Sequence, residues 1–307
     1  MVIAVAIVLV LAMVLAGVYL WPVPRRDFED LSARVPPEIR LSLLEFRQHY
    51  PPQRLNSEGR VWEYVALGEG PETVLFLHGM AGAYDIWWQQ MEALAPDFRV
   101  LSLTYAQADS LAALADGVLA ILAAEAVEVT NVVGSSLGGY LAQYLMATQP
   151  QRLRRVVLGN TFPPNEELAR RNASLIRVLP WLPAWAVMRF FRRSFEQNIY
   201  PAADYSELVL AYLLEQAYGR MSKAQILGRA RAVVEHFAPP DPAALGIPLL
   251  IIEADNDPLV PEKLREQLKT AYPSAQVHTL HAAGHFPYLN RPEAYTRILR
   301  EFLATPV

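Results

Sequence analysis

The 307-residue sequence contains no cysteine, which excludes disulfide bonds, a thiolate nucleophile and zinc sites with cysteine ligands. Proteins without disulfides occur in every compartment, so this absence does not fix the location of the protein. Net charge is also low, because 27 Lys and Arg residues against 31 Asp and Glu residues give a formal charge of −4. The basic residues are dispersed and no basic stretch is interleaved with aromatic residues, which argues against nucleic acid as a partner.

Charged residues are absent from the N-terminal segment Val2 to Leu20. With Trp21, this run of about 20 apolar residues would span roughly 30 Å as a helix, the thickness of a bilayer core. The sequence therefore predicts a transmembrane helix over residues 2–21 that anchors the chain in a lipid bilayer. The alternative is a cleaved signal peptide, but the segment has no basic n-region and no A-x-A site, and its apolar run is longer than usual.

Arg25 and Arg26 lie just beyond the apolar segment. Because positive charge prefers the cytoplasmic side of a membrane, they predict a single-pass protein whose folded domain faces the cytoplasm. Prolines between Pro22 and Pro52 indicate a Pro-rich connector over residues 22–55, with an amphipathic helix near residues 38–49. Residues 56–305 then form one domain of ordinary size.

The domain contains a G-x-S-x-G motif with Ser136 at its centre. Residues 128–133 read as a short β-branched strand before the motif, and residues 137–148 read as a helix after it. In a strand, sharp turn and helix of this kind, the serine has strained backbone geometry and an exposed hydroxyl, while Gly134 and Gly138 let strand and helix approach. Ser136 is therefore a candidate nucleophile. The alternative is a glycine-rich turn that holds a serine by chance.

A serine nucleophile needs a base and an acid, because its hydroxyl is a poor nucleophile at neutral pH. The apolar run at residues 247–253 predicts a strand buried on both faces, and the loop after it contains Asp255 and Asp257. The next candidate strand, residues 276–280, leads to His285, the candidate base. Either aspartate could reach His285 from the loop at the end of the candidate strand 247–253.

The oxyanion of an acyl-transfer reaction needs two N–H donors. One is expected from Leu137, directly after the nucleophile, and the other from Met80 in the His78-Gly79-Met80 turn that follows the candidate strand 73–77. Losing one such donor typically costs about 3 kcal/mol of transition-state stabilisation. His78 itself is expected to brace the turn rather than to transfer protons.

Strand and helix patterns alternate along the domain, which predicts a mostly parallel central sheet with helices on both faces. Strand patterns disappear between residues 163 and 240, which predicts a helical cap insertion. Within it, residues 179–195 place large apolar rings among arginines. These rings could form the core of the cap, line an acyl pocket, dock on the bilayer or bind another protein. Neither a metal nor an organic cofactor is implied.

The HG turn, the serine elbow, the acid loop and the histidine loop, in this order, resemble the α/β-hydrolase superfamily from Arg60 to Leu303. A closer likeness is to maspardin, carried by residues 82–90, 134–144, 158–162, 179–191 and 286–289. The resemblance implies an α/β-hydrolase fold. In the family pattern the acid directly precedes an x-Leu/Ile-Val-Pro run, which implies Asp257 as the acid, whereas Asp255 would brace the loop.

Maspardins keep the serine elbow but lack the histidine and the acid, and the resemblance by itself would imply a non-catalytic binding protein. This chain departs from that pattern because it has His285 and Asp257. The sequence therefore predicts a membrane-anchored serine hydrolase, a carboxylic ester hydrolase that acts on an apolar or lipid-like small-molecule ester through an acyl-enzyme. The alternative is a maspardin-like adaptor that binds a protein partner at its cap. Haloalkane dehalogenation requires an aspartate nucleophile and is disfavoured by Ser136.

Overall fold

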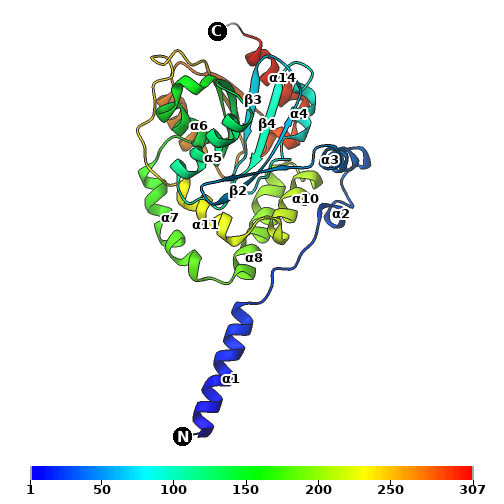
Figure 1. Ribbon diagram of the computed structural model, residues 1–307, viewed down its shortest axis with the longest axis vertical. Coiled ribbons are helices and arrows are strands. Elements are labelled where there is room, and N and C mark those ends of the chain that lie inside the picture. Colours follow the sequence, from blue (N-terminus) through cyan, green and yellow to red (C-terminus); the bar gives the residue numbers. More distant parts are fainter. Residues whose placement is uncertain (1, 306–307) are drawn as a thin grey trace.

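The computed structural model describes residues 2–305, except for the side chains of Leu168 and Arg171. Its centre is an eight-stranded sheet of order β1-β2-β4-β3-β5-β6-β7-β8 (Figure 1). The strands are β1 (Gln53–Ser57), β2 (Arg60–Leu67), β3 (Thr73–Leu77), β4 (Arg99–Thr104), β5 (Thr130–Ser135), β6 (Leu153–Gly159), β7 (Leu249–Ala254) and β8 (Gln276–Leu280). Strand β2 pairs antiparallel with β1 and β4, and all other pairs are parallel. The predicted mostly parallel sheet of an α/β hydrolase is confirmed.

Helices cover both faces of the sheet, because the side chains of its central strands alternate between two buried layers. On β3, Val74 and Phe76 pack in one layer, while Leu75 and Leu77 pack in the other. The first layer contains residues of α4 (Trp88–Leu94) and α14 (Pro292–Leu303). The second contains residues of α5 (Leu111–Ala124), α6 (Leu137–Thr148) and α12 (Glu262–Ala271). The short α13 (Pro287–Asn290) precedes α14.

Five α-helices lie between β6 and β7 in the chain, in the segment for which the sequence predicts a helical cap. Strands β6 and β7 themselves pair directly in the sheet. They are α7 (Glu166–Val178), α8 (Ala184–Ser194), α9 (Tyr200–Ala202), α10 (Glu207–Glu215) and α11 (Lys223–Ala232). Most of the cap lies between the sheet and the N-terminal helix α1 (Val2–Tyr19) in Figure 1.

Helix α1 projects away from the rest of the chain, and none of its residues is buried (Figure 1). It has 18 residues with a mean hydropathy of 2.9, which makes it long and apolar enough to cross a membrane. A signal sequence near the N-terminus can also be long and apolar enough to meet this criterion. The apolar helix expected at this end is present and ends at Tyr19.

The segment predicted to be a connector packs into the domain. Phe28 of α2 (Phe28–Leu31) and Leu43 and Phe46 of α3 (Pro37–His49) are fully buried in the same layer as α4. Strand β1 begins inside this segment, at Gln53, and pairs with β2 along its whole length. Prolines show where helices and strands stop, but they carry no information on whether the pieces between them are buried. The segment packs into the domain, rather than forming a separate connector, because the apolar face of α3 is buried against the domain core.

A cluster of charges around the buried carboxylates of Asp85 and Glu215 joins this segment to the cap. Arg47 on α3 donates hydrogen bonds of 2.6 Å both to Asp85, in the loop after β3, and to Glu215 on α10. Arg220 and Tyr212, both from the cap, donate to Asp85 at 2.7 and 2.6 Å. Burial alone would raise the pKa of Asp85, but Arg220 and Arg47 hold it well below its usual range. Removing one partner would leave a buried charge uncompensated, so the cluster fixes the loop, the cap and α3 to one another.

Candidate active site

Ser136 lies between β5 and α6 and has the backbone geometry expected of a nucleophile elbow. Its φ of 55° and ψ of −118° place it in the left-handed half of conformational space, where a residue with a side chain is strained. Two hydrogen bonds hold it there. The Ser136 N–H donates to the carbonyl of Gly159 at 2.9 Å, and Thr161 Oγ1 donates to the carbonyl of Ser136 at 2.7 Å.

The glycines that the motifs contain lie where backbone segments touch. A Cβ on Gly138 would lie 2.0 Å from the carbonyl oxygen of Leu77, and one on Gly134 would lie 2.2 Å from that of Gly138. A Cβ on Gly79 would lie 3.1 Å from Cβ of Ser136. These contacts require glycine at positions 134 and 138, and they bring the HG turn against the serine.

Asp257 and His285 form a buried pair. Nδ1 of His285 donates to the two carboxylate oxygens of Asp257 at 2.9 and 2.8 Å, and both residues are less than 5% exposed. Burial would raise the pKa of Asp257, but His285, Asn160 and the backbone N–H of Leu259 together lower it below its usual value. The carboxylate is therefore ionised at neutral pH, and its hydrogen bonds with Nδ1 fix the orientation of the imidazole.

Asp255, the other acid of this loop, has a different partner. Its carboxylate accepts from Nδ1 of His281 at 2.7 Å and from the backbone N–H of Ala282 at 3.0 Å. The side chain of His281 is 83% exposed. Of the two acids that the sequence leaves open, the structure therefore brings Asp257 to His285, while Asp255 braces the start of the following loop.

Asn160, the first residue after β6, connects these groups and was missed by the sequence analysis. Its side-chain Nδ2 donates to Asp257 Oδ2 at 2.8 Å and to the carbonyl of Gly284 at 3.2 Å. Its φ of 41° lies in the left-handed region, which asparagine tolerates better than most residues. Because Gly159 and Thr161, on either side of it, both bond to Ser136, Asn160 links the serine elbow to the acid and to the histidine loop.

The expected oxyanion donors lie beside the serine. Leu137 is the first residue of α6, and the N–H groups of a first helical turn have no acceptor within the helix and carry its positive dipole end. Met80 follows Gly79, the residue in contact with Ser136. Both N–H groups thus come from backbone segments that adjoin the nucleophile.

His78 is fully buried and makes contacts typical of a bracing residue. The backbone N–H of Tyr105 donates to its Nε2 at 3.3 Å, so Nδ1 carries the proton and donates to the carbonyl of Gly79 at 2.7 Å. Burial and the charge of Arg229 lower the pKa of His78 well below 6.5, so the ring is neutral. In a trans peptide the N–H points opposite to the carbonyl, so this bond also fixes the direction of the Met80 N–H.

Arg229 on α11 is a second residue that the sequence analysis missed. The side chain is buried, and its Nη1 donates to the carbonyls of Met80 at 2.6 Å and Gly82 at 3.2 Å. Burial lowers its pKa to about 10, so the guanidinium stays charged at neutral pH. Among the described residues none of its hydrogen-bond acceptors is a carboxylate. A buried cation therefore holds the turn that carries Met80, and a lone arginine in a cap helix gives no sequence signal for this.

An apolar cavity of about 170 Å³ adjoins the same turn. Its eleven lining residues come from α7, α8, α11 and the segments around them, together with Met80, and all except Asn172 are apolar. Met80 forms part of its wall, whereas Ser136, Leu137 and His285 are not among its lining residues. A chain bound in the cavity would therefore reach the turn that carries one of the two expected oxyanion donors.

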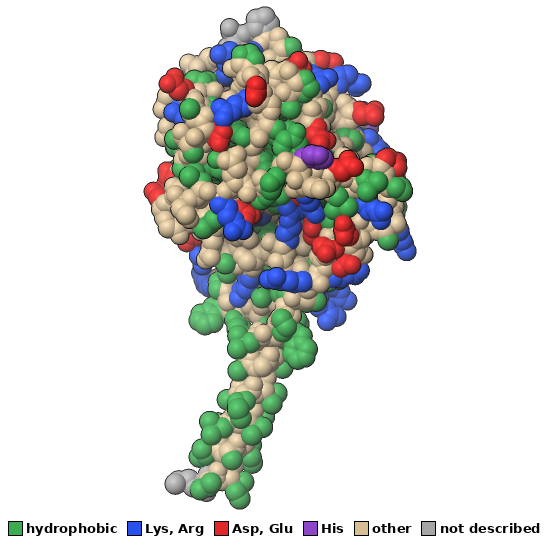
Figure 2. Space-filling model, turned by 45° about the vertical axis from the view of Figure 1, so that its right-hand side comes forward, with side chains coloured by type: hydrophobic (Ala, Val, Ile, Leu, Met, Phe, Trp, Pro, Cys, Tyr) green, Lys and Arg blue, Asp and Glu red, His purple; other side chains and the backbone are tan. Residues whose placement is uncertain are grey.

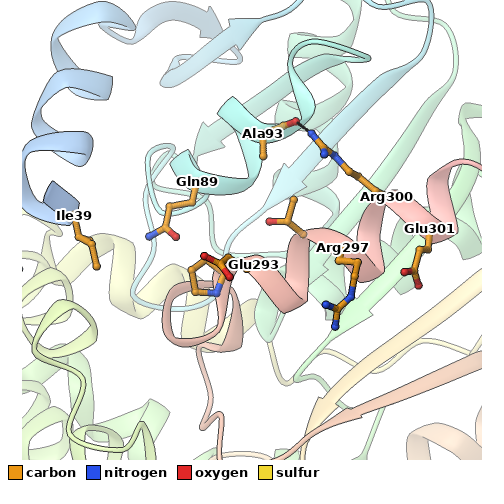
Figure 3. Close-up of a pocket in the computed structure, with 9 residues that line it drawn as sticks. Ile39, Gln89, Ala93, Glu293, Arg297, Arg300 and Glu301 are labelled. Atoms are coloured by element: carbon orange, nitrogen blue, oxygen red, sulfur yellow. Dashed lines mark hydrogen bonds between the residues drawn. The ribbon is translucent and has the colours of Figure 1, made fainter.

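A larger groove of about 520 Å³ lies between α4 and α14 (Figure 3). Figure 3 shows Gln89, Glu293 and Arg297 around it, and Arg300 donating to the carbonyl of Ala93. None of the candidate catalytic residues lines this groove. It therefore lies outside the candidate site.

The family model described as the alpha/beta hydrolase family matches residues 74–298. This range contains the serine elbow, the Asp257–His285 pair and the cap. The chain belongs to the alpha/beta hydrolase family.

Relatives within the family include enzymes and a maspardin. A pimeloyl-[acyl-carrier protein] methyl ester esterase of Vibrio campbellii is 26% identical, over 78% of this chain and 98% of its own length. Maspardin of Danio rerio is 25% identical, over 85% of this chain and 86% of its own length. The predicted sequence similarity to maspardin is confirmed. The sequence identity to the Vibrio campbellii esterase is at least as high.

The solved structure of a hydrolase from Pseudomonas aeruginosa has the same fold, with a TM-score of 0.68 and 22% identity. The match covers 83% of this chain and 99% of that one. At this identity the similarity supports the fold alone.

Proposed function

We propose that this protein is a membrane-anchored serine ester hydrolase that acts on apolar acyl esters through an acyl-enzyme. The observation that carries the proposal is the buried Asp257–His285 pair, joined through Asn160 to the strained elbow of Ser136. The esterase from Vibrio campbellii supports the reaction class. The apolar cavity beside Met80 supports the nature of the acyl group.

In this reaction Oγ of Ser136 attacks the ester carbonyl while Nε2 of His285 takes the hydroxyl proton. The N–H groups of Met80 and Leu137 stabilise the oxyanion, and Asp257 stabilises the imidazolium. The tetrahedral intermediate then expels the alcohol, which receives the proton from His285. Water, deprotonated by His285, attacks the acyl-enzyme in the same way and releases the carboxylic acid with Ser136 restored.

Cavity size should set the acyl chain that the enzyme prefers. Ala230 on α11 lines the cavity, and Ala230→Trp should fill part of it. The ratio of kcat/KM for p-nitrophenyl decanoate to that for p-nitrophenyl acetate should fall roughly tenfold. The reason is that burial of a few methylenes of the acyl chain contributes more binding free energy than a tenfold change requires. Ala224→Trp, on the same helix but away from the cavity, is the control. An unchanged ratio in Ala230→Trp would place the acyl chain elsewhere.

Asn160 should act on the reaction through Asp257. Asn160→Gly removes the amide and tolerates the left-handed backbone, and it should lower kcat on the order of tenfold with little change in KM. Because the amide helps to lower the pKa of Asp257, its loss should raise that pKa and make the carboxylate a stronger acceptor for the protonated imidazole of His285. The acid limb of the kcat–pH profile, which reports protonation of that imidazole, should then move to higher pH. A profile that coincides with wild type would leave Asn160 with a structural role only.

Anchoring by α1 can be tested separately from activity. Full-length protein should stay with membranes after high-salt and alkaline washing, because these treatments remove electrostatic binders but not a spanning helix. A chain that starts at Pro22, and so keeps the buried Phe28, should be soluble. Release of the full-length protein by alkali, or a mature N-terminus after Ala16, would contradict the anchor.

A second candidate function is a maspardin-like adaptor, favoured by the likeness to maspardin over most of the chain. The apolar cavity and the cap would then bind a protein partner, and Ser136 would be unreactive. The two functions differ in one measurable property, the reactivity of the serine.

A further inference from the structure

The C-terminal end of α1 contacts the cap. Nε1 of Trp185, on α8, donates a hydrogen bond of 2.8 Å to the carbonyl of Val18, in the last turn of α1. A little farther along the chain, the guanidinium of Arg26 lies 5.6 Å from the ring centre of Tyr218, which also belongs to the cap. The cap is therefore the part of the domain that meets the end of α1.

Apolar side chains are exposed on this part of the cap. Trp181 is 78% exposed and Phe190 62%, and the other members of the group are Leu175, Val178 and Leu182. We call these five residues the cap edge. Figure 2 shows hydrophobic side chains where α1 meets the domain, with Lys and Arg side chains directly above them. Arg177, Arg189 and Arg193 are exposed within the same stretch of chain. Exposed apolar residues are ordinary when scattered, but a group rimmed by charge is typical of an interaction surface.

The cap edge continues into the interior. Leu175 and Phe190 are exposed and also line the apolar cavity of about 170 Å³ whose wall includes Met80. An apolar path thus runs from the surface beside α1 to the turn that carries the expected oxyanion donor.

We propose that the cap edge docks on the surface of the bilayer that α1 enters, and that the acyl chain of the substrate passes from the bilayer between Leu175 and Phe190 into the cavity. This inference rests on the proposed function, because it takes α1 as a membrane anchor and the cavity as the acyl site.

Helix length sets the depth at which the cap edge lies. Eighteen residues make a helix of about 27 Å, slightly less than a hydrocarbon core of about 30 Å. Val18 then lies at the membrane interface, and Trp185, bonded to it, lies at the same depth, where tryptophan is favoured. The neighbouring arginines can contact anionic headgroups. Continuity with α1 and this charge pattern favour a lipid surface over a protein as the occupant.

Docking can be tested without measuring activity, because the chain has no cysteine and a single introduced one is unique. The full-length variant Val178→Cys is labelled with an environment-sensitive fluorophore and reconstituted in vesicles of phosphatidylcholine with phosphatidylglycerol. Val129→Cys is the matched control, because Val129 is exposed just before β5. Lipids with brominated acyl chains should quench the label at position 178 and not at position 129. A label at 178 that remains in water would overturn the docking and leave the cap edge free for a protein.

Substrate entry is tested with Val178→Glu and the matched Val129→Glu, since Val178 is outside the cavity lining. The rate on a long-chain ester carried in the same vesicles should fall roughly tenfold in Val178→Glu only. Hydrolysis of soluble p-nitrophenyl acetate should match wild type in both variants. Equal losses on the two esters, or no loss on either, would overturn the entry route. If wild type hydrolyses neither ester while the label at 178 is still quenched, the proposed function and the entry route fail but the docking stands.

Discussion

Alanine at position 136 is expected to lower kcat for ester hydrolysis on the order of 10⁶-fold, and adding His285→Ala is expected to lower it little further. The reason is that the nucleophile and the base act as one unit: without Ser136 Oγ there is no proton for His285 to take. The structure supports this coupling, because Asn160 joins the elbow of Ser136 to the loop that carries His285.

Steady-state kinetics of Ser136→Ala, His285→Ala and the double variant with a short-chain ester test this prediction. Thermal unfolding and circular dichroism serve as the control that each variant is folded. Losses that add in the double variant, or substantial activity in His285→Ala, would contradict the assignment of nucleophile and base.

The second large effect is expected at Asp257. Asp257→Asn should lower kcat up to about 10⁴-fold, because an amide favours the wrong imidazole tautomer. In the native protein Nδ1 of His285 donates to the carboxylate of Asp257. Nδ2 of Asn160 also donates to this carboxylate. The amide of Asp257→Asn has a single oxygen, which would have to accept from both His285 and Asn160.

Asp255→Asn is the matched control, since it changes the same charge two positions away in the same loop. Asp255 pairs with the exposed His281 rather than with His285, so its kcat should stay within a few-fold of wild type. The assignment of the acid fails if Asp255→Asn suffers the large loss in kcat while Asp257→Asn keeps nearly full activity.

Local pattern was sufficient to predict the elements around the site. The bounds of β3, β8 and α6 agree with the sequence prediction, because continuous or alternating apolar runs bounded by turn residues are local signals. The elbow was predictable for the same reason, since G-x-S-x-G follows a strand and begins a helix. The fold then followed from the order of these elements.

What the sequence could not predict depends on contacts between distant segments. Asn160 contacts Asp257 and Gly284, which lie 97 and 124 positions away, and Arg229 contacts Met80 from 149 positions away. No local spacing marks such pairs. The burial of α3 depends likewise on distant segments, because Leu43 and Phe46 pack in the same layer as α4 and Arg47 meets Asp85 and Glu215. The proline-rich segment was therefore predicted as a connector although it packs into the domain.

An activated nucleophile at Ser136 is the property that separates a serine hydrolase from a maspardin-like adaptor. The most direct measurement treats purified, folded, full-length protein with a fluorophosphonate and identifies the modified residue by mass spectrometry. We expect stoichiometric modification of Ser136 that is abolished in Ser136→Ala. Folded protein that remains unmodified, or that is modified at another residue, would contradict it.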